Sequence, residues 1–305
     1  MYNNNSGILD SLKFQFVYGG LIIKLVFINV AIFLVMLLFS IIDQHFISGG
    51  VINAIIYDLV AVPADLKTLA TRFWTPISYM FIHSTESIFH ILFNMFALWW
   101  FGNKLVAFQH ESKILPYYFI GGFAGVIAYL AFYNFSGNLN HVSATMVGAS
   151  ASVMCVLFAS IAFSPNYPTH LPIFGEVKLM YIGIVFFLID LASISKGANT
   201  GGHVAHIGGA LAGYLTVKQM QRGNDIVTPL EKLFKWMGDL FRKKPNLTVV
   251  KKDFEPGRYQ KVKKVNSPRE TQAEVDKILD KINEKGYGSL SKEEREFLFT
   301  YSKEN

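Results

Sequence analysis

Cysteine and charged side chains are both scarce in this chain of 305 residues. The single cysteine, Cys155, lies in an apolar stretch, so neither an intrachain disulfide nor a cysteine-based metal site can form. Charged residues make up 16% of the chain, whereas soluble domains contain roughly 25%. Because 51% of the residues are hydrophobic, the composition indicates a chain that crosses a membrane several times rather than a soluble enzyme.

The positive residues are concentrated near the end of the chain. Of the 28 lysines and arginines, 20 follow Val217. Segments rich in these residues stay on the cytoplasmic side, so the tail is predicted there, and an even number of spans places the N-terminus there too. The first apolar stretch is longer than the core of a signal peptide and lacks a small-residue cleavage motif, so we expect no cleavage.

Six apolar stretches are predicted to form an all-α membrane bundle. They are Leu21–Ile42, Ser87–Phe101, Leu115–Tyr133, Ala144–Phe163, Val177–Ala192 and Gly202–Val217. Several are shorter than the ~20 residues of a full crossing, which is tolerated where protein surrounds the helix or a cavity admits water. The long loop 43–86 is rich in aromatic residues and is expected in the membrane interface.

Pairs of glycines four residues apart predict close helix packing. Gly121 and Gly125 form one pair, and Gly209 and Gly213 form another. The second pair indicates that the stretch 202–217 lies against another helix and not in open lipid.

The polar tail is predicted to be helical at both ends. The stretch Leu230–Arg242 has one apolar face, and two placements are open: on an anionic leaflet, or on a core of the tail itself. A basic linker, Asn246–Lys264, precedes a predicted helical hairpin, Thr271–Lys303, whose second helix opens with a capping box. The chain thus divides into a cytoplasmic segment 1–20, a membrane domain 21–217, an amphipathic helix and linker 218–270, and a cytoplasmic hairpin 271–305.

Ser150 is the candidate nucleophile, because small residues surround it in the sequence Gly-Ala-Ser-Ala. A serine hydroxyl attacks a carbonyl only when a base takes its proton. A lone serine of this kind is also common in membrane helices, where it bonds to its own backbone, so the motif needs a partner.

His206 is the candidate base. It shares a helix face with His203 and with the glycine stripe, so it points at whatever packs against those glycines. If Ser150 lies there, the two residues form a catalytic dyad. Asp190 is the nearest membrane carboxylate, but it lies toward the end of another stretch and is not assigned to a triad.

His90 and Asn94 are four residues apart and project from one helix face. Imidazole and amide groups can both donate hydrogen bonds to an oxyanion, and the backbone N–H of Ser150 could add a third. The alternative is a polar clasp between helices, which contributes about 1 kcal/mol.

A metal site is the other chemistry that histidines in a membrane could support. In principle His83, His90, His203 and His206 could gather around zinc. The chain has no His-Glu-x-x-His motif, and no carboxylate stands at helical spacing from these histidines. We therefore predict neither a metal nor another cofactor.

Together these residues resemble the rhomboid family of intramembrane serine proteases, over roughly Leu21 to Val217. Three motifs in order on the second, fourth and sixth stretches make the resemblance specific. They are His-x-x-x-Asn at His90 and Asn94, Gly-x-Ser at Gly148 and Ser150, and Ala-His-x-x-Gly-x-x-x-Gly at Ala205, His206, Gly209 and Gly213.

The resemblance implies a six-helix bundle that hydrolyses peptide bonds of transmembrane proteins near the extracytoplasmic face. Ser150 and His206 would be the catalytic dyad, and His90 and Asn94 would hold the oxyanion. A non-catalytic relative that binds transmembrane clients is the alternative, although such proteins typically lose the serine or the histidine. A transporter would usually show repeated halves, and the sequence has no internal repeat.

The expected partners are transmembrane substrates and the lipid bilayer, with no nucleic acid; the sequence identifies no partner for the tail. The resemblance makes a bacterial cytoplasmic membrane the expected location, and the hairpin resembles a short domain appended to some bacterial members.

Three positions depart from the family pattern. Ala151 stands where the family usually has glycine. Met154 replaces an aromatic residue that commonly packs on the catalytic imidazole, and Thr75 follows Trp74 where the family has arginine.

Overall fold

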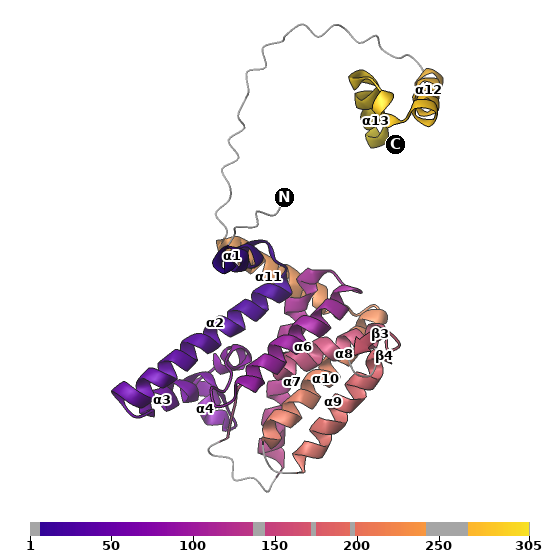
Figure 1. Cartoon of the computed structure of the whole chain (residues 1–305). Coiled ribbons are helices and arrows are strands. Elements are labelled where there is room, and N and C mark those ends of the chain that lie inside the picture. Colours follow the sequence, from indigo (N-terminus) through magenta and orange to yellow (C-terminus); the bar gives the residue numbers. More distant parts are fainter. Residues whose placement is uncertain (1–6, 137–143, 172–174, 196–198, 242–267, 305) are drawn as a thin grey trace. The chain divides into compact units, whose positions relative to one another are not determined.

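The computed structural model describes residues 7–136, 144–171, 175–195, 199–241 and 268–304. The chain forms two compact units, Met1–Arg242 and Lys243–Asn305. Figure 1 shows that the first unit is mostly helical.

Each of the six predicted apolar stretches overlaps a helix of the first unit. These are α2 (Leu21–Ile42), α6 (Ile88–Val106), α7 (Ile114–Phe135), α8 (Ser150–Phe163), α9 (Leu179–Ile194) and α10 (Thr200–Gln221). Within the described residues, two helical segments, Leu21–Ile47 and Glu111–Phe135, are long and apolar enough to cross a membrane unaided. The count of six spans stays a prediction.

Two helix starts were predicted too early, because strands precede the helices. Thr145–Met146 forms the short strand β2, which pairs with β1 (Val62–Pro63), and helix α8 begins only at Ser150. Val177 likewise lies in β4 (Gly175–Lys178), which pairs with β3 (Pro168–Leu171) before α9 begins. The long loop 43–86 therefore reaches the segment that carries Ser150.

The remainder of that loop is mostly short helices rather than irregular chain. It contains the π-helix η1 (Asp43–Ile47), α3 (Val51–Val60), α4 (Leu66–Thr71), α5 (Thr75–Ser78) and η2 (Tyr79–Phe81). Helix α1 (Ile8–Tyr18) precedes α2, and the 3₁₀ turn η3 (Glu111–Lys113) precedes α7.

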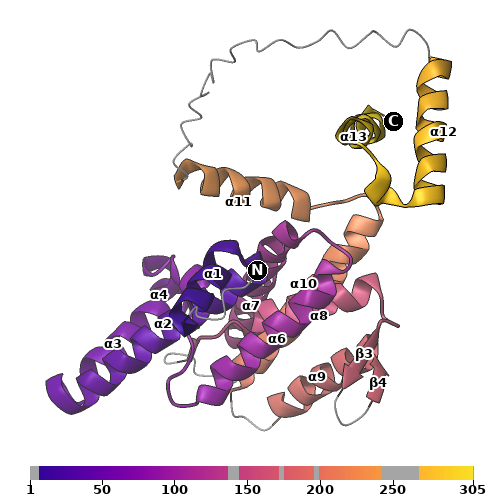
Figure 2. The ribbon, with the colours of Figure 1, turned by 45° about the horizontal axis from the view of Figure 1, so that its top comes forward.

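Helix α8 is the central element of the unit and lies among α6, α7 and α10 (Figure 1 and Figure 2). From Ala151 to Ala162 every side chain is buried except that of Phe158, which is half-buried. A helix that is apolar on all sides is stable only when protein or lipid surrounds it. Here the enclosing helices supply that surface.

Glycines of α7 and α10 let the backbones approach α8 closely. A Cβ atom at Gly209 would meet the backbone oxygen of Ala151, and one at Gly213 would meet that of Cys155. A Cβ atom at Gly121 would meet the Cys155 side chain from the α7 side. The prediction of tight packing at both glycine pairs is confirmed.

Helix α11 (Val227–Phe241) belongs to the first unit and packs on α7 and η3. The Phe234 ring lies 5.0 Å from that of Phe119 on α7, and Glu231 accepts a hydrogen bond from Ser112 in η3. Several apolar side chains of α11 remain exposed, namely Leu233, Trp236, Met237 and Leu240. Contact of this face with a leaflet remains a prediction.

The second unit contains the predicted helical hairpin, with α12 (Pro268–Lys285), η4 (Tyr287–Ser289) and α13 (Lys292–Glu304). Lys281 Nζ lies 2.8 Å from Glu294 Oε1, and Glu294 also accepts from the Ser291 N–H at 2.7 Å. Both contacts lower the pKa of Glu294. The capping box is confirmed, whereas the linker 246–264 lies outside the described residues.

We predict that Gly125 and Ala151 are energetically coupled. A Cβ atom at Gly125 would lie 2.5 Å from the Ala151 methyl group and 3.2 Å from Tyr79 Oη. Gly125→Ala should therefore destabilise the protein by ~1–3 kcal/mol. Adding Ala151→Gly should recover more than half of that loss, although glycine in a helix costs about 1 kcal/mol itself.

The coupling is measured from the free energies of unfolding in detergent. The cycle compares wild type, both single variants and the double variant. Gly238→Ala is the control, because no atom of the described residues lies within 4 Å of a Cβ there. Strictly additive effects of the two substitutions would contradict the predicted contact.

Candidate active site

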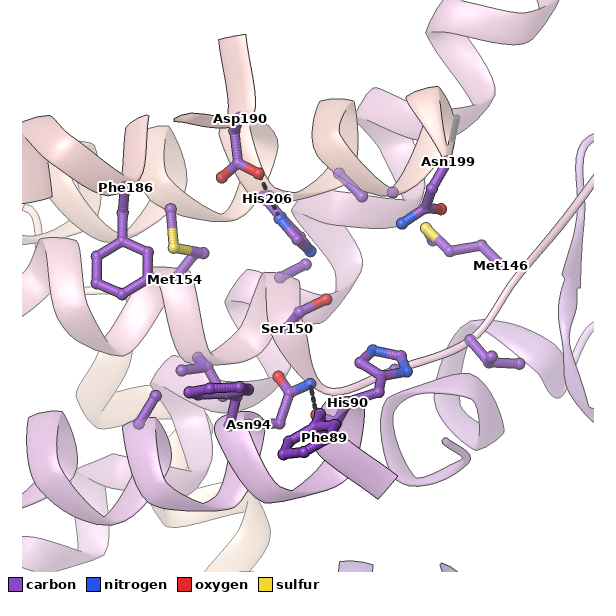
Figure 3. A pocket seen from close by; sticks show the side chains of 18 of the residues that line it. Phe89, His90, Asn94, Met146, Ser150, Met154, Phe186, Asp190, Asn199 and His206 are labelled. Atoms are coloured by element: carbon purple, nitrogen blue, oxygen red, sulfur yellow. Dashed lines mark hydrogen bonds and ion pairs between the residues drawn. The ribbon is translucent and has the colours of Figure 1, made fainter. Parts of the chain in front are cut away.

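One cavity of about 430 Å³ contains all four residues predicted to carry chemistry (Figure 3). Ser150 comes from the start of α8, His206 from α10, and His90 and Asn94 from α6. Side chains of α9 complete the wall. Residues more than 100 positions apart thus face one space.

The backbone at Gly148 brings Ser150 to this cavity. Its φ angle is +126°, a conformation that side-chain-bearing residues rarely adopt. Its N–H donates to the carbonyl of Tyr79 at 3.0 Å, and a Cβ atom here would lie 3.0 Å from His90 Nε2. Glycine is required for both the turn and the approach to His90.

Ser150 is the first residue of α8, so its backbone N–H belongs to the helix start. The first four N–H groups of a helix have no partner within it, and they carry partial positive charge. The serine hydroxyl and a hydrogen-bond donor for an oxyanion therefore sit on the same residue.

Asn94 and His90 are held by hydrogen bonds and ring packing. Asn94 Nδ2 donates to the carbonyl oxygen of His90 at 2.8 Å, which leaves its second amide hydrogen for another acceptor. The His90 ring lies 5.3 Å from that of His83, which is fully buried. His83 Nε2 accepts from the N–H of Ala149 at 3.5 Å. His83 thus supports the segment before Ser150.

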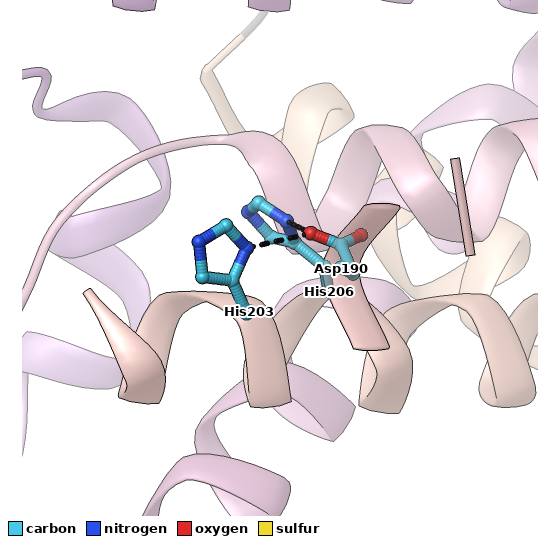
Figure 4. A group of neighbouring side chains, drawn as sticks. All are labelled: Asp190, His203 and His206. Atoms are coloured by element: carbon cyan, nitrogen blue, oxygen red, sulfur yellow. Dashed lines mark hydrogen bonds and ion pairs between the residues drawn. The ribbon is translucent and has the colours of Figure 1, made fainter. Parts of the chain in front are cut away.

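His206 has a carboxylate partner that the sequence did not reveal. Asp190 Oδ1 accepts from Nδ1 of His206 and from Nδ1 of His203, each at 2.8 Å (Figure 4). Asp190 is on α9 and both histidines are on α10, so only helix packing brings them together. The available signal was that Asp190 is an acidic residue within an apolar stretch.

Ser150 and His206 face one another across the cavity (Figure 3). Within the described part of the chain no hydrogen bond joins the two side chains. Catalytic hydrogen bonds are often long until substrate closes the site, so this spacing is compatible with proton transfer.

Of the four histidines that could in principle have gathered around a metal, the structure groups two with a carboxylate. Within the described ranges, the group with suitably close ligand atoms is Asp190, His203 and His206, whose ligand atoms lie within 4.8 Å of one another. Both Nδ1 atoms here donate hydrogen bonds to the carboxylate. A metal would require them to lose those hydrogens, since only a bare imidazole nitrogen is a ligand.

The structure shows what surrounds each of the three positions that depart from the family pattern. The methyl group of Ala151 lies where Gly125 leaves room for it, and Met154 lines the cavity. In the loop, Arg72 rather than residue 75 supplies a guanidinium, which lies 2.8 Å from the Asp58 carboxylate.

Comparison with known protein families gives a match to the part of the chain that carries this site. Residues 70–222, half of the chain, match the family described as "Rhomboid domain". Residues 262–304, which include both helices of the hairpin, match a "Family of unknown function (DUF6576)".

Curated relatives carry rhomboid-like names. The zebrafish (Danio rerio) "Presenilin-associated rhomboid-like protein A, mitochondrial" is 28% identical over 43% of this chain and 33% of its own length. The Arabidopsis thaliana "RHOMBOID-like protein 12, mitochondrial" is 26% identical over 50% of this chain and 48% of its own. A mouse (Mus musculus) presenilin-associated rhomboid-like protein is 26% identical over 54% and 46%.

The chain spans between a third and about half of the length of these relatives. The family match covers α6 to α10, the helices that carry the candidate site. The chain therefore belongs to the rhomboid family and is a membrane protein.

Proposed function

We propose that this protein is an intramembrane serine endopeptidase that cleaves transmembrane proteins near the extracytoplasmic face. The observation that carries the proposal is that Ser150 and His206 line one cavity together with two candidate oxyanion donors, His90 and Asn94. This grouping of side chains supports the proposed activity, and family membership supports it as well.

The proposed reaction begins with attack of Ser150 Oγ on the carbonyl carbon of the scissile peptide. His206 Nε2 takes the hydroxyl proton as the new C–O bond forms, and then gives it to the leaving amine as the C–N bond breaks. Water hydrolyses the resulting acyl ester by the same steps, with His206 again accepting and returning the proton.

Negative charge on the tetrahedral oxygen needs donors that are already in place. The Ser150 N–H, the free amide hydrogen of Asn94 and the His90 ring are the proposed donors. Fixed donors in a site shielded from water are effective because they need no reorganisation during the reaction.

Apolar side chains connect the cavity with the outside of the protein and support a membrane-embedded substrate. Phe89 and Phe93 of α6, and Phe186 and Ile189 of α9, line the cavity and are themselves exposed. In a bilayer these side chains would face lipid, so an apolar peptide segment could reach Ser150 between them.

We also propose that residues 21–217 form the catalytic membrane domain, with both termini on the side opposite the site, as the distribution of Lys and Arg predicts. The names of the relatives place those proteins in mitochondria, so they give no support to the expected bacterial cytoplasmic membrane. No observation specifically favours a non-catalytic client binder, since the serine and the histidine are both present.

The dyad assignment predicts that Ser150→Ala and His206→Ala each abolish cleavage without unfolding the bundle. The assay is cleavage of a model transmembrane substrate in liposomes, with mass spectrometry of the fragments. Ser152→Ala is the matched control, because Ser152 is buried two residues further along α8. Among the residues that the structure describes, its Oγ has no hydrogen-bond partner and it is not part of the cavity lining. Cleavage by the Ser150→Ala variant would contradict the proposal.

The oxyanion assignment predicts that Asn94→Ala lowers kcat by about 10²- to 10³-fold, the usual effect of losing one such donor. Asn103→Ala is the control, because Asn103 makes the same type of bond, to the carbonyl of Trp99 at 2.6 Å, at an exposed position of the same helix. Equal rates for the two variants would return Asn94 to a packing role.

A further inference from the structure

We propose that Asp190 is a positioning residue for His206: its carboxylate keeps the imidazole ring oriented with hydrogen on Nδ1 and with Nε2 toward Ser150. The catalytic consequence of this role rests on the proposed function. The orientation itself can be measured without any turnover.

The hydrogen-bond geometry determines the tautomer. Asp190 Oδ1 lies 2.8 Å from His206 Nδ1, and an ionised carboxylate only accepts hydrogen bonds. The hydrogen therefore resides on Nδ1, and in the neutral ring Nε2 is left with a lone pair. Figure 3 shows His206 between Asp190 and Ser150, the order that a base oriented from behind requires.

The carboxylate is itself firmly held. Its side chain is 7% exposed, and His203 Nδ1 donates to the same oxygen at 2.8 Å. A carboxylate inside an apolar span is costly unless it is paired, and here two donors from α10 hold it (Figure 4). Asp190 is therefore a fixed acceptor, with a definite direction toward His206.

The Asp190 hydrogen bond is directional, in contrast to contacts made by the thioether side chain that shares the cavity with His206. Met154 lines the same cavity as His206 and Asp190. A thioether is flexible and fixes a ring only weakly. Asp190 restrains the ring from the Nδ1 side, and this restraint depends on a single, directional contact.

The same contact matters when charge develops. When Ser150 gives its proton to Nε2, His206 becomes an imidazolium that bears hydrogens on both nitrogens. The adjacent carboxylate stabilises this cation, and Asp190 takes no proton at any step.

The kinetic test compares Asp190→Ala, Asp190→Asn and wild type on the transmembrane substrate in liposomes, with EDTA present. Asp190→Ala should lower kcat by about 10²-fold or more and leave KM within about threefold. Asp190→Asn should lower kcat as well, because the amide has no charge and can donate to Nδ1 instead of accepting from it.

Leu191→Ala is the matched control, since Leu191 neighbours Asp190 on α9 and is exposed. The kcat of Leu191→Ala should stay within about threefold of the wild-type value. Thermal unfolding of every variant identifies any loss of folding. A kcat of folded Asp190→Ala within about threefold of wild type would overturn the proposal. Loss of wild-type activity in EDTA would also overturn it, because the three groups would then act as metal ligands.

Nitrogen-15 NMR of labelled histidine provides the second readout, with His206→Ala used to assign the His206 signals by their loss. The proposal expects hydrogen on Nδ1 of His206 in wild type and loss of that preference in Asp190→Ala. A His206 tautomer that is the same in both proteins would overturn it. If wild type cleaves nothing while the tautomer depends on Asp190, the proposed function fails and the positioning role stands.

Discussion

The close contact of helix α8 with the glycines of α7 and α10 is the constraint on which the site depends. Gly209 lies against the carbonyl of Ala151, the residue that follows Ser150. His206 is one turn before Gly209 on the same face of α10. The packing that buries α8 therefore also fixes how far the candidate base lies from the candidate nucleophile. A larger residue at Gly209 would displace both.

Three polar side chains beside the cavity, His83, Asn94 and Asp190, each have a hydrogen-bond partner, and these contacts help to define the cavity. His83 supports the chain before Ser150, Asn94 is tied to its own helix, and Asp190 receives two histidine donors. An unpartnered polar group is costly in apolar surroundings, so each of these contacts has few alternatives. Burial of these groups therefore restricts the site to few alternative side-chain arrangements.

Much of this arrangement could be predicted from sequence, because local patterns carry it. The spacing of His90 and Asn94 on one helix face, and the glycines that follow His206, depend only on helical periodicity. Asp190 could not be assigned in this way, since its contact joins two helices whose approach no local pattern encodes. The same holds for the pairing of β1 with β2, which delays the start of α8 to Ser150, and for the docking of α11 on α7.

Covalent labelling tests the central claim most directly, namely that His206 activates Ser150 inside the membrane domain. The purified protein would be treated with a fluorophosphonate, and the modified residue would be located by mass spectrometry in wild type and in His206→Ala. The account predicts an adduct on Ser150 of wild type, none on Ser152, and none in the variant. A folded wild type without an adduct, or equal labelling of Ser150 in both proteins, would contradict it.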